Sequence, residues 1–165
     1  MGFEQAGFEI VWTNEFDKDF AKLHAAGITS WRKSQGNGIK AEIFNTKSIT
    51  EISSKEILTE AFPQGKPEDF GIIGGPPCQD FSMNGSRKGF KGDRGKLTII
   101  FFDKILEMEP TFFVMENVTG LIKSKSNKEF LIKLLNRVNK RYYIDYKTLN
   151  ALDFGVPQFR ERLFF

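Results

Sequence analysis

The sequence predicts an α/β protein built on a mostly parallel, doubly wound sheet. Short apolar runs alternate with stretches of helical periodicity along most of the 165 residues. Polar residues follow three of the expected strands, at Glu15, Cys78 and Glu116. Because the carboxyl ends of strands in such a sheet lie on one edge, these residues predict a single site with one thiol and two carboxylates.

The composition is that of a mildly basic chain long enough for one domain with its own core. Its 24 Lys and Arg residues outnumber its 21 Asp and Glu residues, which gives a net charge of +3. This balance permits a nucleic-acid partner without requiring one. The single cysteine excludes an internal disulfide and suits a reducing compartment. Because the sequence has neither a signal-peptide pattern nor a long uncharged apolar run, we expect a cytoplasmic protein without a membrane span.

The N-terminal part is expected to contain three helical segments and two strands. Phe16, Phe20 and Leu23 recur at helical spacing on the second helix. Ser53 and Glu56 form a capping box that starts the third. The expected elements are the end of a helix over 3–8 closed by Gly7, a strand over 10–15, a helix from Asp17 to Gly27, a loop over 30–38, a strand over 39–44 and a helix over 53–62.

The C-terminal part is expected to continue the alternation of strands and helices. Apolar residues recur at helical spacing until Pro110, and the continuous apolar run over 112–115 is typical of a buried strand. The glycine-rich basic run over 84–95 has no periodicity and predicts a mobile loop. The expected elements are strands over 70–73 and 112–115, helices over 97–108 and 130–138, the second capped by Asn127, and strands over 142–149 and 162–165.

Cys78 comes directly after a Gly-Gly-Pro-Pro turn that stops the strand over 70–73. A lone cysteine is usually a small buried hydrophobe. Its place at the carboxyl end of a strand, where open α/β sheets bind ligands, favours a nucleophilic thiol instead. Glu116 would then deliver a proton, the alternative being a structural carboxylate. Glu15 would hold ribose hydroxyls, the alternative being a solvated side chain.

A polar cluster near the C-terminus adds two guanidinium groups. If this segment is extended, Gln158, Arg160 and Arg162 project from one face, and Phe159 and Glu161 from the other. Two arginines on one face suit recognition of a base oxygen and orientation of an acid. The alternative is a solvated cationic strand.

Taken together, these motifs resemble those of the DNA cytosine-5 methyltransferases, and the resemblance covers essentially the whole chain. The matching segments, in this order, are Asn-Glu-Phe-Asp over 14–17, Pro-Pro-Cys-Gln-Asp-Phe-Ser over 76–82, Arg-Gly-Lys-Leu over 94–97, Glu-Asn-Val over 116–118 and Gln-Phe-Arg-Glu-Arg over 158–162. A proline-cysteine pair alone would be common, whereas this ordered set is highly specific.

The resemblance implies a Rossmann-like, S-adenosylmethionine-dependent methyltransferase fold and a covalent mechanism. Cys78 would add to C6 of a cytosine flipped out of double-stranded DNA, and Glu116 would protonate or hydrogen-bond N3. C5 would then take the methyl group of S-adenosylmethionine, and loss of the C5 proton would expel Cys78. Arg162, with Arg160 nearby, would hold the cytosine O2 and position Glu116.

The resemblance also assigns the binding residues. The cofactor would be bound by Glu15, Phe16, Ser48, Ile49, Pro76 and Leu97. The DNA would be contacted by Gln79, Ser82, Arg87, Lys88, Lys91, Arg94 and Gln158. No metal site is predicted.

Three departures from the family pattern qualify this expectation. The first motif, a glycine turn after a central strand, would precede Gly2, so the strands ending near Glu15 and Cys78 are expected to have unpaired edges. The target recognition domain would follow Phe165. Ser48 stands where the family usually has aspartate. We therefore expect an incomplete catalytic domain over 1–165 that is inactive and poorly stable alone. The parent protein would be a restriction-modification enzyme. The chain would be either a gene fragment or one subunit of a split enzyme.

Two other functions remain open at this point. The chain would be a noncatalytic DNA-binding remnant if its DNA affinity were salt-dependent and indifferent to Cys78. It would be an RNA cytosine-5 methyltransferase if it acted on structured RNA with the same chemistry. A cysteine hydrolase using His24 is least favoured, because no orienting carboxylate is identified for that residue.

Overall fold

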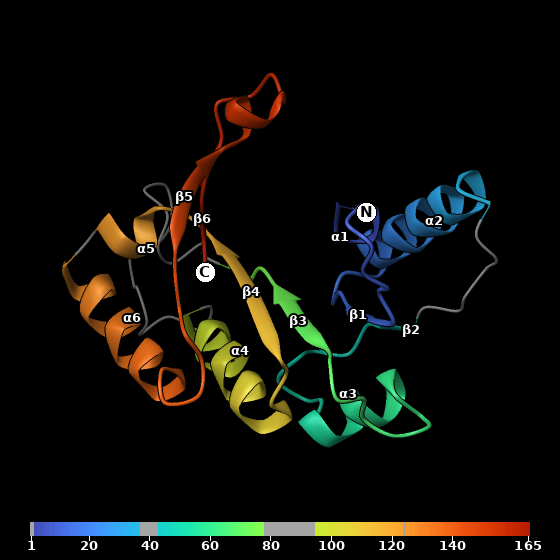
Figure 1. Cartoon of the computed structure of the whole chain (residues 1–165), viewed down its shortest axis with the longest axis horizontal. Coiled ribbons are helices and arrows are strands. Elements are labelled where there is room, and N and C mark those ends of the chain that lie inside the picture. Colours follow the sequence, from blue (N-terminus) through green and yellow to red (C-terminus); the bar gives the residue numbers. More distant parts are fainter. Residues whose placement is uncertain (1, 37–42, 78–94, 124) are drawn as a thin grey trace. The chain divides into compact units, whose positions relative to one another are not determined.

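The computed structural model describes residues 2–36, 43–77, 95–123 and 125–165. The chain forms two compact units, 1–67 and 68–165 (Figure 1). In the described part of the chain, none of the helices combines the length and apolar character needed to cross a membrane.

The described part of the first unit contains a small parallel sheet and three helices. Its strands pair from Trp12 opposite Ile43 to Asn14 opposite Asn45. The strand expected over 39–44 is therefore shifted toward its C-terminal end, with 39–42 outside the described residues. The elements are α1 (Gly2–Gln5), β1 (Trp12–Asn14), α2 (Lys18–Ser34), β2 (Ile43–Asn45) and α3 (Ser54–Ala61).

Helix α2 is longer than the sequence suggests. Its N-cap is Asp17, whose carboxylate accepts the backbone N–H groups of Asp19 and Phe20 at 2.9 and 3.2 Å. The prediction that Gly27 ends this helix is wrong, as is the loop expected from residue 30, because the helix continues to Ser34. One interior glycine costs a helix only about 1 kcal/mol, which favourable packing of the following turns offsets.

The apolar stripe expected on α2 lies on its solvent-facing side. Phe20 and Leu23 are 64% and 69% exposed, and Phe16, just before the helix, is 71% exposed. The buried face consists of Ala21, Ile28 and Arg32. The helix carries two stripes at helical spacing, and local periodicity does not distinguish the one that packs.

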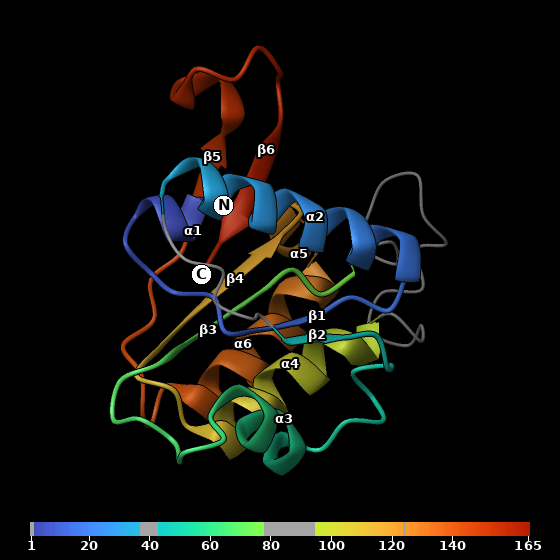
Figure 2. The same cartoon turned by 90° about the vertical axis from the view of Figure 1, so that its right-hand side faces the viewer.

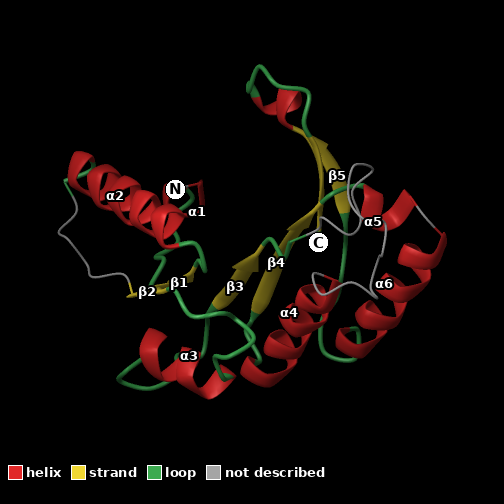
Figure 3. Cartoon of the chain, turned by 180° about the vertical axis from the view of Figure 1, so that it is seen from behind, coloured by secondary structure: helices red, strands yellow, loops and turns green. Residues whose placement is uncertain are grey.

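The strands described in the second unit form a four-stranded mixed sheet in the order β3-β4-β6-β5. β3 and β4 are parallel, whereas β6 is antiparallel to both β4 and β5. Figure 3 shows α4 and α6 side by side against this sheet. The elements are β3 (Gly71–Gly74), α4 (Gly95–Met108), β4 (Phe112–Asn117), α5 (Gly120–Lys123), α6 (Lys125–Val138), β5 (Lys147–Asn150), the 3-10 helix η2 (Ala151–Phe154) and β6 (Glu161–Phe164).

The hydrophobic core of this unit lies between the sheet and its helices. Phe102 and Ile105 of α4 pack with Met115 of β4 and Leu163 of β6, together with buried residues of α5 and α6. Phe112 packs so closely on Gly71 that a Cβ atom there would clash with its ring. The lack of a side chain at this position of β3 therefore permits the observed packing.

Two elements of the second unit differ from the sequence-based prediction. The strand expected over 142–149 begins only at Lys147, and the Tyr142 hydroxyl instead donates to the Pro110 carbonyl at 2.7 Å. Asn127 does not cap α6, which already begins at Lys125. Its side-chain amide donates to the Gly120 carbonyl at 3.3 Å and so ties α6 to α5.

A hairpin formed by β5, η2 and β6 extends away from the helices of its unit (Figure 2). Asn150 fixes its turn, because its Oδ1 accepts the backbone N–H groups of Leu152 and Arg160 at 3.2 and 3.1 Å. Gly155 takes up a left-handed conformation, with φ of 80°, at the end of η2. The apolar side chains Leu152, Phe154, Val156 and Phe159 near this turn are exposed.

β1 and β3 belong to different sheets. Among the described strands, β1 pairs with β2 alone and β3 with β4 alone. These two strands lead to Glu15 and Cys78, and they are the ones for which the sequence predicts unpaired edges. The sheets that contain them are parallel and mixed, as expected for a partial Rossmann-like fold.

Candidate functional site at the end of β4

Glu116 lies near the carboxyl end of β4 and forms an ion pair with Arg162 of β6. Glu116 is opposite Phe164 in the antiparallel register, so Arg162, two residues earlier, lies diagonally across on the same face. The Arg162 Nε is 2.8 Å from Glu116 Oε1, with the two side chains 24% and 37% exposed. Because both groups are partly solvated, the pair serves to orient the carboxylate more than to stabilise the fold.

The segment that leads to Cys78 is held against the same strand end. Asn117 is buried, and its side-chain amide donates to the Pro76 carbonyl at 3.3 Å, while its Oδ1 accepts the Val118 N–H at 2.9 Å. A Cβ atom at Gly75 would lie 3.3 Å from Glu116 Oε2. The two oxygens of Glu116 therefore have different neighbours, Arg162 at one and the Gly75 backbone near the other.

The structure brings only one of the two predicted arginines to Glu116. β6 begins at Glu161, so the prediction of one extended face over 158–162 is wrong for its first half. Gln158 and Arg160 belong to the hairpin turn and are exposed. The backbone of Arg160 contributes instead to the turn through Asn150.

The predicted cofactor residues of the first unit gather after its two strands. The Glu15 N–H donates to the Asn45 carbonyl at 3.1 Å, which extends the β1–β2 ladder, and its side chain accepts the Asp17 N–H at 2.9 Å. The Phe16 ring is exposed beside it. The Ser48 hydroxyl is 2.7 Å from that of Thr50, and Ile49 is half-buried.

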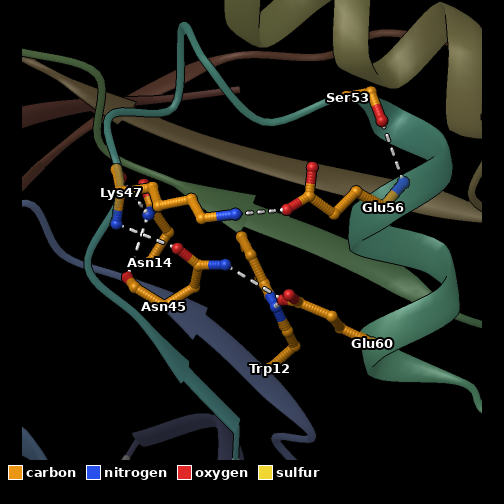
Figure 4. A network of polar contacts seen from close by, with 7 residues as sticks. All are labelled: Trp12, Asn14, Asn45, Lys47, Ser53, Glu56 and Glu60. Atoms are coloured by element: carbon orange, nitrogen blue, oxygen red, sulfur yellow. Dashed lines mark hydrogen bonds and ion pairs between the residues drawn. The ribbon is translucent and has the colours of Figure 1, made fainter.

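A polar network that the sequence does not reveal supports the turn after β2 (Figure 4). Glu60 Oε2 accepts the Trp12 indole N–H at 2.7 Å and the Asn45 amide at 3.0 Å. These hydrogen bonds, first that of Trp12, lower the pKa of Glu60 below its usual value. Asn14 donates to the Asn45 and Lys47 carbonyls at 3.0 and 2.9 Å, so the network fixes the backbone that leads to Ser48.

The remaining predicted residues differ in how far the structure describes them. In the second unit, Pro76 and Leu97 are half-buried. Cys78, Gln79, Ser82, Arg87, Lys88, Lys91 and Arg94 lie outside the described residues. His24 is exposed, and its ring makes an edge-on contact with Phe44 at 5.7 Å between centroids.

The fold and this site define an α/β protein with polar residues at the carboxyl ends of its parallel strands, where such proteins bind ligands. The chain matches the sequence model of the C-5 cytosine-specific DNA methylases over residues 1–165. It therefore belongs to this family.

Known relatives show how much of a full-length family member the chain represents. It is 39% identical to the Type II methyltransferase M.FnuDI of Fusobacterium nucleatum over 166 residues, which are 100% of this chain and 42% of that protein. It is 41% identical to the Type II methyltransferase M.AquIA of Picosynechococcus in an alignment of 172 positions that covers 99% of this chain and 64% of that protein. The chain thus spans about two fifths of the first relative's length.

Solved structures agree with the fold. A structure described as a prophage-encoded DNA modification methyltransferase of E. coli superimposes with a TM-score of 0.73 at 30% identity, covering 97% of this chain and 40% of the other. The Dnmt2 methyltransferase of S. pombe superimposes with a TM-score of 0.57 at 20% identity, covering 94% and 42%. The second comparison supports the fold alone.

Proposed function

We propose that the chain is the catalytic part of a DNA cytosine-5 methyltransferase of the restriction-modification kind, which methylates C5 of a cytosine flipped out of double-stranded DNA. The observation that carries the proposal is the Arg162–Glu116 pair beside the backbone of residues 75 and 76. It sets an oriented carboxylate next to the segment that leads directly to a lone cysteine.

Glu116 is suited to hydrogen-bond the cytosine ring because its two oxygens are differentiated. Arg162 occupies Oε1, and among the described residues no hydrogen bond is made to Oε2, which lies near Gly75. In this proposal Oε2 faces the base and, when it carries the proton of the carboxyl group, donates that proton or a hydrogen bond to N3 while Arg162 keeps the group in place. Arg162 would also hold the cytosine O2, with the exposed Arg160 of the hairpin turn assigned to assist it.

Cys78 provides the nucleophile of the proposed reaction. Its thiolate forms a bond to C6, and the electron pair of the C5–C6 double bond moves to C5 as N3 is protonated or hydrogen-bonded. C5 then forms the new bond to the methyl group, whose bond to the sulfonium sulfur of the donor would break, so that the donor would leave as a neutral thioether. Loss of the C5 proton restores the double bond and breaks the S–C6 bond, so the thiolate is regenerated.

The first unit offers groups that fit S-adenosylmethionine, which supplies the methyl group when bound. Glu15 presents an exposed carboxylate at the end of β1, suited to two ribose hydroxyls. Phe16 presents an exposed ring for the adenine. The Ser48 hydroxyl and Ile49, held by the network around Asn45, would complete the adenine contacts. The proposal also assigns Pro76 and Leu97 of the second unit to cofactor binding.

The parts of the relatives beyond the matched length would carry target recognition, on the same polypeptide or on a separate chain. The test is therefore made with the 165-residue chain and with the complete gene product or complex that contains it. We expect the complete protein to transfer labelled methyl groups to duplex DNA and the 165-residue chain to be inactive alone. Structured RNA is the comparison substrate, and preferential methylation of it would contradict the DNA proposal.

The Cys78→Ser variant tests the covalent mechanism. We expect methyl transfer to fall to background and DNA containing 5-fluorocytosine to form a stable adduct only with the wild type, because fluorine blocks the elimination that frees the cysteine. Gel electrophoresis under denaturing conditions detects the adduct. Methyl transfer that survives in Cys78→Ser would overturn the mechanism, whereas retained DNA binding without methylation by the wild type would favour a noncatalytic DNA-binding protein.

A further inference from the structure

Three lysines gather where α5 ends and α6 begins, and we name Lys123, Lys125 and Lys128 the corner lysines. All three side chains are exposed. The first turn of α6 contains no acidic residue. Residues 123–129 include three lysines and one carboxylate, the exposed Glu129, so the corner has a net positive charge.

The corner lysines differ from the ion-paired arginines of the same unit. Arg137 pairs with Asp103, Arg141 with Glu109 and Arg162 with Glu116. Within the described ranges, none of the corner lysines forms an ion pair. Their charge is therefore not neutralised by the described carboxylates and remains available for an external anion.

The backbone that carries the corner lysines is fixed to the core. Leu121 of α5 is fully buried, and Leu131 of α6 belongs to the same hydrophobic cluster. The hydrogen bond from Asn127 to the Gly120 carbonyl joins the two helices between these anchors. The lysine side chains are thus flexible groups on a rigid base, which suits repeated contacts with a regular charged surface.

The corner also lies near the candidate site. α5 begins at Gly120, three residues after β4 ends at Asn117. In Figures 1 and 3, α5 lies beyond the carboxyl end of β4, the end that carries Glu116. A long anion bound near Glu116 would therefore extend toward the corner lysines.

We propose that Lys123, Lys125 and Lys128 bind backbone phosphates of the DNA that flanks the target cytosine. This inference rests on the proposed function, which supplies the DNA. Residues 125 and 128 are separated by about 4.5 Å along the helix axis, and phosphates of one strand by about 3.4 Å along the duplex axis. Long lysine side chains easily accommodate this difference, so neighbouring lysines would contact successive phosphates.

The experiment compares two triple variants with the same change in charge. Lys123→Gln/Lys125→Gln/Lys128→Gln removes the corner charge. Lys18→Gln/Lys33→Gln/Lys55→Gln is the matched control, because these exposed lysines lie on α2 and α3 of the first unit. Affinity of the complete protein or complex that contains the chain for end-labelled duplex DNA of mixed sequence is measured by fluorescence anisotropy over a series of NaCl concentrations, with circular dichroism as the test of folding.

Each phosphate contact contributes about 0.9 to the slope of log K against log salt. We therefore expect the corner variant to lose roughly two to three units of slope and to bind more weakly at low salt, and the control to keep most of its slope. An equal loss in both variants would overturn the proposal, since it would indicate a general charge effect, and so would wild-type protein that does not bind DNA.

The outcome is separable from that of the proposed reaction. Failure of the methylation mechanism would appear as absent methyl transfer and absent adduct with DNA affinity still dependent on the corner lysines. Failure of the present inference would appear as a Cys78-dependent methyltransferase whose salt slope is unchanged by the corner substitutions.

Discussion

At the scale of residues, Glu116 is constrained by groups from two neighbouring strands. Arg162 of β6 binds one oxygen, and the backbone at Gly75, just after β3, approaches the other. The Asn117 side chain holds the Pro76 carbonyl against the end of β4. The absence of a side chain at residue 75 is thus what allows a carboxylate to lie against this segment.

Gly75→Ala is expected to impair catalysis without unfolding the protein. The added methyl group would lie 3.3 Å from Glu116 Oε2 and would displace the carboxylate by a few tenths of an ångström. Because a misplacement of about 1 Å can lower the rate roughly 100-fold, a shift of a few tenths of an ångström should lower kcat by a few-fold to about 10-fold. Steady-state methyl transfer by the complete protein measures the effect, and thermal melting checks stability.

The control for this variant is Gly27→Ala, where an added Cβ atom meets nothing within 4 Å. This substitution should leave kcat unchanged. A Gly75→Ala protein with wild-type kcat would show that the position of Oε2 does not matter for the reaction.

The residues of the site were predictable from sequence only where a motif marks them. Glu116 and Arg162 were predicted because both belong to recognisable motifs. Glu116 directly follows an apolar run, and Arg162 lies in the strand expected over 162–165. The Trp12–Glu60 contact was not predictable, because its partners are 48 residues apart and neither lies in a motif. Arg160 was misplaced because alternation along an assumed strand was extended into a turn.

At the scale of elements, α1 depends on the last turns of α2. α1 has four residues, too few for a helix that is stable alone. Arg32, close to the end of α2, donates to the Glu4 carboxylate and, at 2.9 Å, to the Ile10 carbonyl. This contact exists only because α2 continues past Gly27, so the longer helix and the position of α1 are linked.

The Glu4–Arg32 pair predicts a pH dependence of stability. The hydrogen bond from Arg32 is the main cause that lowers the pKa of Glu4 below 4.5. A carboxylate with a depressed pKa in the folded state stabilises fully above its unfolded pKa, and this contribution is lost as pH falls through the folded value. Glu4→Gln should therefore lower the free energy of unfolding by about 1.5–3 kcal/mol at pH 7.

The difference between wild type and Glu4→Gln should shrink as pH falls below about 4.5, the usual pKa of the group. Urea denaturation between pH 7 and pH 3 measures it. Glu68→Gln, at an exposed position, is the control and should change little. A Glu4→Gln difference that stayed constant over this range would contradict the assigned role of the carboxylate charge.

Element types were more predictable than element ends or faces. The N-cap at Ser53 is confirmed by the hydrogen bond from the Glu56 N–H to Ser53 Oγ at 3.1 Å, because a cap is a local interaction. Among the described residues, the reciprocal half of the expected capping box does not form, since the Glu56 carboxylate pairs with Lys47 instead. The end of α2 at Ser34 and the burial of Ala21 instead of Phe20 depend on packing between distant segments. Local periodicity contains no information on that packing.

At the scale of the whole molecule, the two units differ in how much core they contain. Most of the largest fully buried side chains, including Phe102, Met115 and Leu163, belong to residues 68–165, whereas Ile52 is the one from residues 1–67 among those described. The first unit also has strands of only three residues. Local opening should therefore require less free energy in the first unit.

Hydrogen–deuterium exchange tests this difference directly. Peptides from α4, β4 and α6 should retain their amide protons longer than peptides from β1, β2 and α2. Exchange is measured at two pH values, because this comparison shows whether the observed rate reports the opening equilibrium or the rate of opening. Uniform protection across both units would contradict the expectation, since it would show that the chain opens only as a whole.

The edge of β3, which pairs with β4 alone among the described strands, also bears on how the protein behaves at high concentration. Exposed strand edges are templates on which chains aggregate, and β3 lies at the edge of its sheet. Its sequence, Gly-Ile-Ile-Gly, offers four residues of which two are glycines with low strand propensity. Such an edge is a poor template for intermolecular strand addition, so we expect loss of soluble protein to begin at exposed apolar side chains, such as those of the β5–β6 hairpin, and not at this strand.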